Sequence, residues 1–260
     1  MSSASCRTLV ILAPQAAMPA PEHILYNLLF KSQGASLMSV YQAVLFDLDG
    51  TLVDTAPDFI RVLNRLRAHY DRPPLPHDII RAAVSAGARA MVQTGFPEHA
   101  PDSAEFLRLR QEFLDQYAQG LTAESRLFEG MDSLLTTLEH QGIPWGVVTN
   151  KPRVYTEPLL AGLALDQRCR VVVCPDDVRR TKPDPEPMLL ACHHLGVVPS
   201  GTVYIGDHLR DIEAGRNAGM PTIAAGWGYI VAGEDPADWR ADQLAMTVPE
   251  LYSLLELTQA

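Results

Sequence analysis

Short apolar runs alternate with amphipathic segments over most of the chain. After about residue 127, the runs "WGVV", "RVVV", "VYIG" and "TIAA" are each followed by a stretch with apolar residues at helical spacing. Short strands that alternate with helices are typical of a parallel sheet with crossover helices. The run "AVLF", residues 43–46, supplies a first strand. The pattern therefore predicts an α/β protein with a Rossmann-like parallel sheet core.

A second region shows helical periodicity only. In "DFIRVLNRLRAHY" and "SAEFLRLRQEFLDQYAQG" the apolar residues recur every three or four positions, and Gly87 marks a break between helices. No strand is expected between the two parts of the sheet. We therefore predict a catalytic core made of residues 41–56 and 127–260. Residues 57–126, called the helical insert below, are expected to form a separate all-helical cap domain.

The first forty residues differ from the rest. The stretch "CRTLVILAPQAAMPA" has one arginine and a short apolar run, as secretory signals do, but Pro14 interrupts the run. Met38 directly precedes the first convincing strand. We expect residues 1–40 to be a disordered extension, or residues 1–37 to be an artefact of the assigned start site.

Composition narrows the class of protein. Hydrophobic residues make up 47% of the 260, which is ordinary for a globular protein. The formal net charge of −10 argues against nucleic acid or an anionic membrane as a partner. The four cysteines form no CxxC pair, which favours reduced thiols and a cytoplasmic location. A small molecule is therefore the expected partner, and the oligomeric state stays open.

Polar residues follow the predicted strands at the point where each strand ends. Each has an ordinary explanation by itself: an Asp-Gly turn, a helix cap or a solvated lysine. Ligands of parallel sheets bind beyond the carboxyl ends of the strands, where all of these residues should meet. They comprise four carboxylates, one cation, one hydroxyl and one amide: Asp47, Asp49, Thr149, Asn150, Lys182, Asp207 and Asp211.

A cluster of carboxylates requires a positive charge between its members. Because all the expected ligands are oxygens, a hard cation such as Mg²⁺ fits better than zinc or copper. Magnesium sites that retain water often also hold a phosphate. The sequence thus predicts Mg²⁺ as the cofactor, with Asp47, Asp49 and Asp207 as its ligands.

Four segments together resemble a known family. "DLDGTLVDT", "VVTN", "TKPDPEP" and "GDHLRDIEAGRNAGM" are similar, in order and spacing, to the signature motifs of the haloacid dehalogenase superfamily. The helical insert resembles the cap of its phosphoglycolate phosphatase group. "SAGARAMV", "WGVVTNKP" and "CPDDV" are similar to a branch of that group that acts on N-acetylmuramic acid 6-phosphate in peptidoglycan recycling.

The resemblance implies a phosphoric monoester hydrolase with an aspartyl-phosphate intermediate. It implies that Asp47 is the nucleophile and Asp49 the general acid and base. Thr149, Asn150 and Lys182 would bind the phosphoryl group, and Asp211 would support the metal ligands. An acid at position 49 argues against a dehalogenase, which has no alkoxide to protonate.

Substrate choice is assigned to the helical insert. Ser85, Gly87 and Arg89 are expected to reach the substrate, and Arg89 is either a partner for a substrate carboxylate or an ordinary solvated arginine. N-acetylmuramic acid 6-phosphate is the expected substrate, followed by 2-phosphoglycolate. A phosphomutase with the same motifs and a non-catalytic binding protein remain as alternatives.

Overall fold

The computed structural model describes residues 41–231 and 233–257. The expectations for residues 1–40 lie outside these ranges. None of the helices in the described part of the chain is long and apolar enough to cross a membrane.

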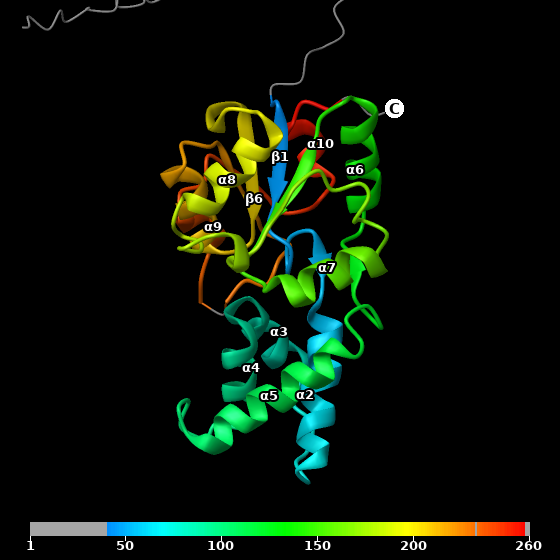
Figure 1. Ribbon diagram of the computed structural model, residues 1–260, viewed down its shortest axis with the longest axis vertical. Helices are drawn as coiled ribbons and strands as arrows, with labels where there is room; N and C mark the ends of the chain where they lie inside the picture. Colours follow the sequence, from blue (N-terminus) through cyan, green and yellow to red (C-terminus); the bar gives the residue numbers. More distant parts are fainter. Residues whose placement is uncertain (1–40, 232, 258–260) are drawn as a thin grey trace, which may run out of the picture. The chain divides into compact units, whose positions relative to one another are not determined.

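A six-stranded sheet forms the centre of the core, as predicted. All neighbouring strands are parallel, in the order β5-β4-β1-β6-β7-β8. Figure 1 labels the two central strands, β1 and β6. In the central register, Val44 lies opposite Trp145 on one side and Val203 on the other. The strands are β1 Ala43–Phe46, β4 Trp145–Val148, β5 Val172–Val173, β6 Thr202–Gly206, β7 Thr222–Ala225 and β8 Gln243–Ala245.

Alternate residues of each strand pack on opposite faces of the sheet. Val44 and Phe46 join the apolar cluster that contains α6, α7 and α10, whereas Leu45 joins the cluster that contains α8 and α9. Both faces are therefore covered, which explains why the strands are apolar throughout. The helices are α6 Met131–His140, α7 Arg153–Gly162, α8 Glu186–Leu195, α9 Leu209–Asn217 and α10 Glu250–Leu254. Short 3₁₀ turns occupy Pro175–Asp177, Pro199–Gly201 and Pro236–Trp239.

The order of the strands places a switch point at the centre of the sheet. After β1 the chain adds β4 and β5 on one side, and it then returns to place β6 on the other side of β1. Crossover connections diverge at such a point and leave a crevice beyond the carboxyl ends of the strands. The residues that follow β1, β4 and β6 therefore meet in one place.

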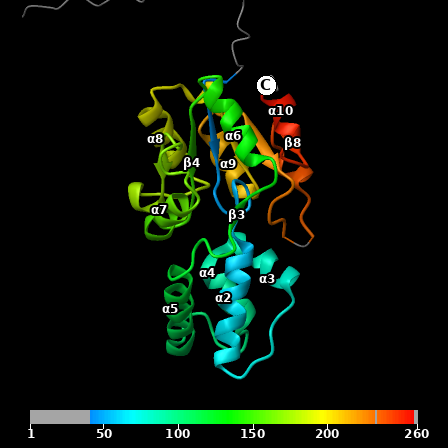
Figure 2. The ribbon, with the colours of Figure 1, turned by 90° about the vertical axis from the view of Figure 1, so that its right-hand side faces the viewer.

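The helices of the insert pack around one apolar cluster, which also includes Tyr229 of the core. Figure 2 shows these helices grouped together, apart from the sheet. The stripes seen in the sequence are buried together, including Phe59, Leu63, Phe106 and Phe113. Gly87 has a φ angle of 78° and lies at the junction between a 3₁₀ turn, Val84–Ala86, and the next helix. The break in the apolar pattern predicted this junction. The helices are α2 Ala56–His69, α3 His77–Ala83, α4 Gly87–Gly95 and α5 Ala104–Ala118.

A small antiparallel pair joins the helical insert to the core. The strands β2 Val53–Asp54 and β3 Arg126–Leu127 pair where the chain leaves the core and where it returns. Sequence analysis missed this pair because two-residue strands are too short to show a period.

Candidate active site

Three carboxylates gather at the carboxyl ends of β1 and β6. Asp47 directly follows β1, Asp207 directly follows β6, and Asp211 lies in the first turn of α9. All three are buried, and one oxygen of each lies within 4.8 Å of the others. The structure thus brings together these three predicted residues.

Lys182 lies against this cluster. Its Nζ is 2.9 Å from Oδ1 of Asp47 and 2.7 Å from Oδ1 of Asp211, and it donates to the hydroxyl of Tyr204 at 2.8 Å. Burial opposes the charge on this ammonium group, but the two carboxylates outweigh burial and raise the pKa of Lys182. Lys182 is therefore held as a cation.

The three acids differ in how readily they ionise. Burial opposes ionisation of Asp47, but Lys182 and Arg210 outweigh it and lower the pKa of Asp47. Burial and the neighbouring acids raise the pKa of Asp207 to about 7. Burial, together with the charge of Asp47, raises the pKa of Asp211 to about 6 despite the opposing effect of Lys182. The cluster thus holds more negative charge than Lys182 neutralises.

This donor set fits a hard divalent cation. All three side chains offer oxygen, and apart from the ion pair with Lys182 the buried carboxylate oxygens of Asp211 have no hydrogen-bond partner. A divalent cation between the carboxylates would remove the repulsion that raises the pKa of Asp207 and Asp211.

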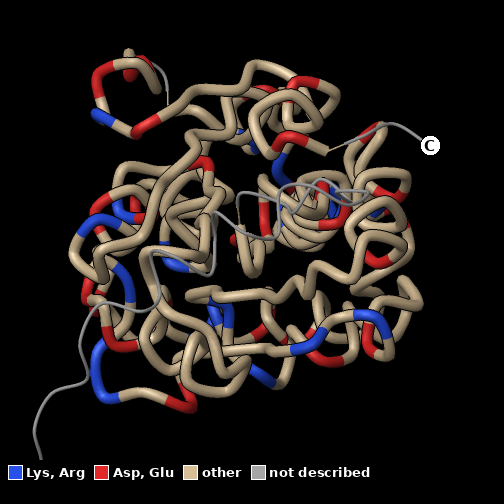
Figure 3. Tube along the Cα trace, turned by 90° about the horizontal axis from the view of Figure 1, so that it is seen from above, with Lys and Arg blue, Asp and Glu red and all other residues tan. Residues whose placement is uncertain are grey.

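Acidic and basic residues are interspersed along the rest of the described chain (Figure 3).

Glycines leave room for the acids. A Cβ on Gly228 would lie 2.2 Å from Cβ of Asp207, and one on Gly206 would lie 2.4 Å from Cβ of Asp211. Gly50 has a φ angle of +87°, and its Cβ would lie 2.1 Å from Oδ2 of Asp207. The backbone therefore approaches the carboxylates as closely as it can, and any larger residue would displace them.

Asp49 binds a second lysine. Its Oδ1 accepts hydrogen bonds from Thr55 Oγ1 at 2.6 Å and from Lys151 Nζ at 2.9 Å, and Lys151 also donates to the hydroxyl of Tyr117 in α5 at 2.9 Å. Burial opposes the charge of Lys151, but Asp49 and Tyr117 outweigh it and raise the pKa of Lys151. The expectation of one cation at this edge is wrong, because Lys151 and Arg210 accompany Lys182. The signal for Lys151 was its position directly after "VVTN".

The two polar residues after β4 have different surroundings. Both Thr149 and Asn150 line the cavity described below. The hydroxyl of Thr149 accepts a hydrogen bond from the Lys151 amide at 3.1 Å. The side-chain amide of Asn150 donates to the carbonyl of Lys182 at 3.1 Å and accepts from its N–H at 3.2 Å. Asn150 was expected to bind phosphate. Both ends of its side-chain amide bond to the backbone of Lys182, and a role in phosphate binding stays a prediction.

A cavity of about 590 Å³ opens over the acids, between the core and the helical insert. Asp47 and Asp49 line it from the core, whereas Lys182 and Asp207 lie behind its lining. Further lining residues come from the helical insert, from the loop after β4, and from α7 and α9: Ser85, Gly87, Arg89, Arg110, Leu114, Tyr117, Thr149, Asn150, Lys151, Val154, Tyr155 and Arg210.

The predicted residues of the helical insert all reach this cavity. Ser85 Oγ donates to Oδ2 of Asp207 at 3.4 Å, and the Ser85 carbonyl accepts from the guanidinium of Arg210. Gly87 leaves open space, since an added Cβ would meet nothing within 4 Å. Arg89 lines the cavity, but its side chain is 56% exposed and pairs with Asp102 at 3.1 Å.

Comparison with known proteins agrees with this geometry. The family model described as haloacid dehalogenase-like hydrolase matches residues 44–225. The chain belongs to this family. Hydrolases of this family use a divalent metal, which agrees with the buried acidic cluster.

Similar proteins are named as phosphatases. The chain is 50% identical over 215 residues to N-acetylmuramic acid 6-phosphate phosphatase of Pseudomonas aeruginosa, covering 83% of this chain and 95% of that protein. It is 41% identical to phosphoglycolate phosphatase of Xanthomonas campestris pv. campestris strain 8004, covering 81% of this chain and 95% of that protein. A crystal structure described as a predicted phosphoglycolate phosphatase from Haemophilus somnus 129pt has a TM-score of 0.75 and 25% identity. It covers 84% of this chain and 99% of its own. The prediction of a phosphatase is confirmed.

Proposed function

We propose that this enzyme is a Mg²⁺-dependent phosphomonoesterase that hydrolyses N-acetylmuramic acid 6-phosphate through an aspartyl-phosphate. The observation that carries the proposal is Asp47, a carboxylate with a lowered pKa that lines the cavity and pairs with Lys182. An ionised oxygen at the base of a cavity and beside a cation is suited to attack an anionic phosphorus centre.

In the first step, a carboxylate oxygen of Asp47 forms a bond to phosphorus while the bond from phosphorus to the sugar oxygen breaks. Asp49 gives its proton to the departing oxygen, which leaves as the free alcohol. Thr149 and Lys182 neutralise charge on the phosphoryl oxygens during the transfer. Because Lys151 holds Oδ1 of Asp49, it keeps that carboxyl group directed at the cavity.

In the second step, water attacks phosphorus and the bond to the Asp47 oxygen breaks. Asp49 accepts the proton of the water, phosphate leaves, and the carboxylate of Asp47 is restored. We propose that the side chains of Asp47 and Asp207 and the backbone carbonyl of Asp49 would hold Mg²⁺, with Asp211 as a direct or supporting ligand. The bound ion supplies positive charge that stabilises the phosphoryl oxygens in the transition state.

The size of the cavity supports the larger substrate. Cavities of roughly 300–1,000 Å³ hold molecules of drug size, and this one is about 590 Å³. An acylated amino sugar phosphate would occupy much of that volume, whereas 2-phosphoglycolate would leave most of it to water. 2-Phosphoglycolate is the second candidate, because it is named in relatives such as the Xanthomonas protein. We propose that the helical insert acts as the cap that closes this cavity.

We also propose a cytoplasmic location for the enzyme. The described cysteines, Cys169, Cys174 and Cys192, are all free thiols. Free thiols are usual in a reducing compartment.

The test is phosphate release from a panel of phosphate esters with Mg²⁺ present, including both candidates. The highest kcat/KM is expected for N-acetylmuramic acid 6-phosphate. Asp47→Asn is expected to abolish turnover and to leave the circular dichroism spectrum unchanged. Phosphate release by Asp47→Asn at the wild-type rate would refute the nucleophile, and formation of an isomeric phosphate without phosphate release would indicate a phosphomutase.

A further inference from the structure

The cavity is lined by three arginines with different partners. Arg210 lies at the reaction centre, where it donates to the Ser85 carbonyl and lowers the pKa of Asp47. Arg89 is already paired with Asp102 and packs 5.9 Å from the centre of the Phe106 ring. Arg110, in the described part of the chain, has no hydrogen bond, ion pair or ring contact. It is therefore the arginine in this lining that is free to bind an anion.

The position of Arg110 follows from the periodicity of α5. Arg110, Leu114 and Tyr117 are spaced by four and three residues, so they share one face of the helix, and all three line the cavity. The Tyr117 hydroxyl accepts from Lys151, which holds Asp49, so this end of the row lies at the reaction centre. Seven residues of α-helix rise about 10 Å, which places Arg110 well away from the phosphate position.

This separation distinguishes between the two candidate substrates. In 2-phosphoglycolate about three single bonds of roughly 1.5 Å separate phosphorus from the carboxyl carbon. In N-acetylmuramic acid 6-phosphate about eight such bonds separate phosphorus from the lactyl carboxyl carbon. For an axial separation of about 10 Å, the longer molecule is the one expected to reach Arg110 with its carboxylate while its phosphate lies at Asp47.

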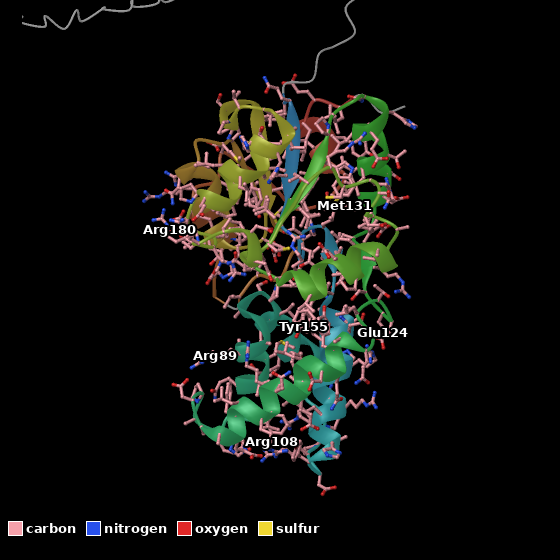
Figure 4. All side chains as sticks on the ribbon, in the orientation of Figure 1. Arg89, Arg108, Glu124, Met131, Tyr155 and Arg180 are labelled. Carbon is pink, nitrogen blue, oxygen red and sulfur yellow. The ribbon has the colours of Figure 1, made fainter. Side chains whose placement is uncertain are left out.

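The lining between these two ends is partly apolar. Leu114 lies between Arg110 and Tyr117 on α5, and Val154 and Tyr155 of α7 also line the cavity. Val154 is 66% exposed and offers apolar surface to the cavity. Figure 4 shows Tyr155 at the boundary between α7 and the helical insert. Apolar and aromatic groups of this kind can pack on the faces of a sugar ring.

We propose that Arg110 is the carboxylate-binding residue of this enzyme and that it selects substrates with a lactyl carboxylate on the sugar. The proposal rests on the proposed function and deepens it. An arginine binds a carboxylate through two parallel hydrogen bonds, and charged hydrogen bonds contribute more than neutral ones. Without a carboxylate on the ligand, Arg110 keeps its contact with water.

The experiment compares two substrates that differ only in the lactyl group, N-acetylmuramic acid 6-phosphate and N-acetylglucosamine 6-phosphate. The measured quantity is the ratio of their kcat/KM values. Arg110→Gln should lower this ratio about 10- to 100-fold, as expected for one charged hydrogen-bonded pair, mainly through KM of the carboxylated substrate. Arg110→Lys should restore part of the ratio because it retains the charge.

The matched control is Arg108→Gln on the same helix. Arg108 pairs with Glu105 at 2.5 Å and donates to the Tyr70 hydroxyl, and it is not part of the cavity lining. In Figure 4 it lies at the end of the helical insert that is far from the sheet. Its loss should leave the ratio at the wild-type value.

Two further outcomes separate this proposal from the proposed function. If Arg110→Gln leaves the ratio unchanged, or if Arg108→Gln lowers it equally, the carboxylate subsite is refuted while the phosphatase assignment stands. If the wild-type enzyme releases no phosphate from N-acetylmuramic acid 6-phosphate, the proposed substrate is refuted and the subsite with it.

Discussion

The replacement Asp207→Asn tests whether the acidic cluster is built for a cation. In the metal-free protein, the pKa of Asp207 is raised from 3.8 to about 7, chiefly by burial and then by Asp47 and Asp211. The folded state therefore holds this proton more tightly than the unfolded state does. The free energy of unfolding should fall as the pH rises from about 4 to about 7, and it should then level off.

The size of this effect follows from the shift itself. Three pKa units at about 1.4 kcal/mol each are on the order of 4 kcal/mol. For a domain of this length, 1 kcal/mol changes Tm by about 2–4 °C. At pH 8, the metal-free wild-type protein should therefore melt about 10 °C lower than metal-free Asp207→Asn. Asparagine has the same shape and no charge, and Asp47 and Asp211 titrate in both proteins. The difference between the two proteins therefore reports the charge of Asp207, including its interaction with Asp47 and Asp211.

The assay is thermal unfolding in a chelator at several pH values between 5 and 8. Wild type should lose stability relative to Asp207→Asn over this range. Added Mg²⁺ should raise the Tm of wild type at pH 8 more than at pH 5, because the ion competes with protons for the same oxygens. If Tm changes with pH in the same way in the two proteins, ionised Asp207 does not destabilise the fold. The argument for a cation between the acids would then fail.

Three more changes test the remaining parts of the site. Asp47→Asn should reduce kcat by at least about 10⁴-fold with the fold retained, since it removes the nucleophile. Single-turnover phosphate release measures this, and a loss below tenfold would contradict the role. Lys151→Met should reduce kcat about 10- to 100-fold, because Oδ1 of Asp49 then accepts a hydrogen bond only from the Thr55 hydroxyl. Steady-state kinetics measure this. A wild-type kcat would show that Lys151 does not position Asp49. Gly228→Ala should abolish the Mg²⁺-dependent rise in Tm, because its Cβ would lie 2.2 Å from Cβ of Asp207; a normal rise would mean that Asp207 can move without loss of the metal site.

Local patterns in the sequence were sufficient for the fold class. The apolar run "AVLF" and the strands after residue 127 predicted a parallel sheet, and the apolar stripes of the helical insert predicted its buried residues. These signals are local because burial of one face imposes a period on neighbouring residues. The acids after β1 and β6 were predicted to meet for a related reason: parallel strands end at the same edge of a sheet.

The tertiary structure decided which side chains share a partner. Lys151 and Lys182 both follow strands, yet only the folded chain assigns one to Asp49 and the other to Asp47 and Asp211. The sequence also could not show that the side-chain amide of Asn150, which lines the cavity, bonds to the backbone of Lys182.

The sequence could not distinguish between the arginines of the helical insert for the same reason. Both Arg89 and Arg110 lie on amphipathic helices, and the sequence drew attention only to Arg89, through the motif around it. Whether an arginine is free depends on a counter-charge that lies elsewhere in the fold, here Asp102. Periodicity determines which face a residue occupies, whereas its charge partner depends on distances of a few ångströms between segments that only the folded chain brings together.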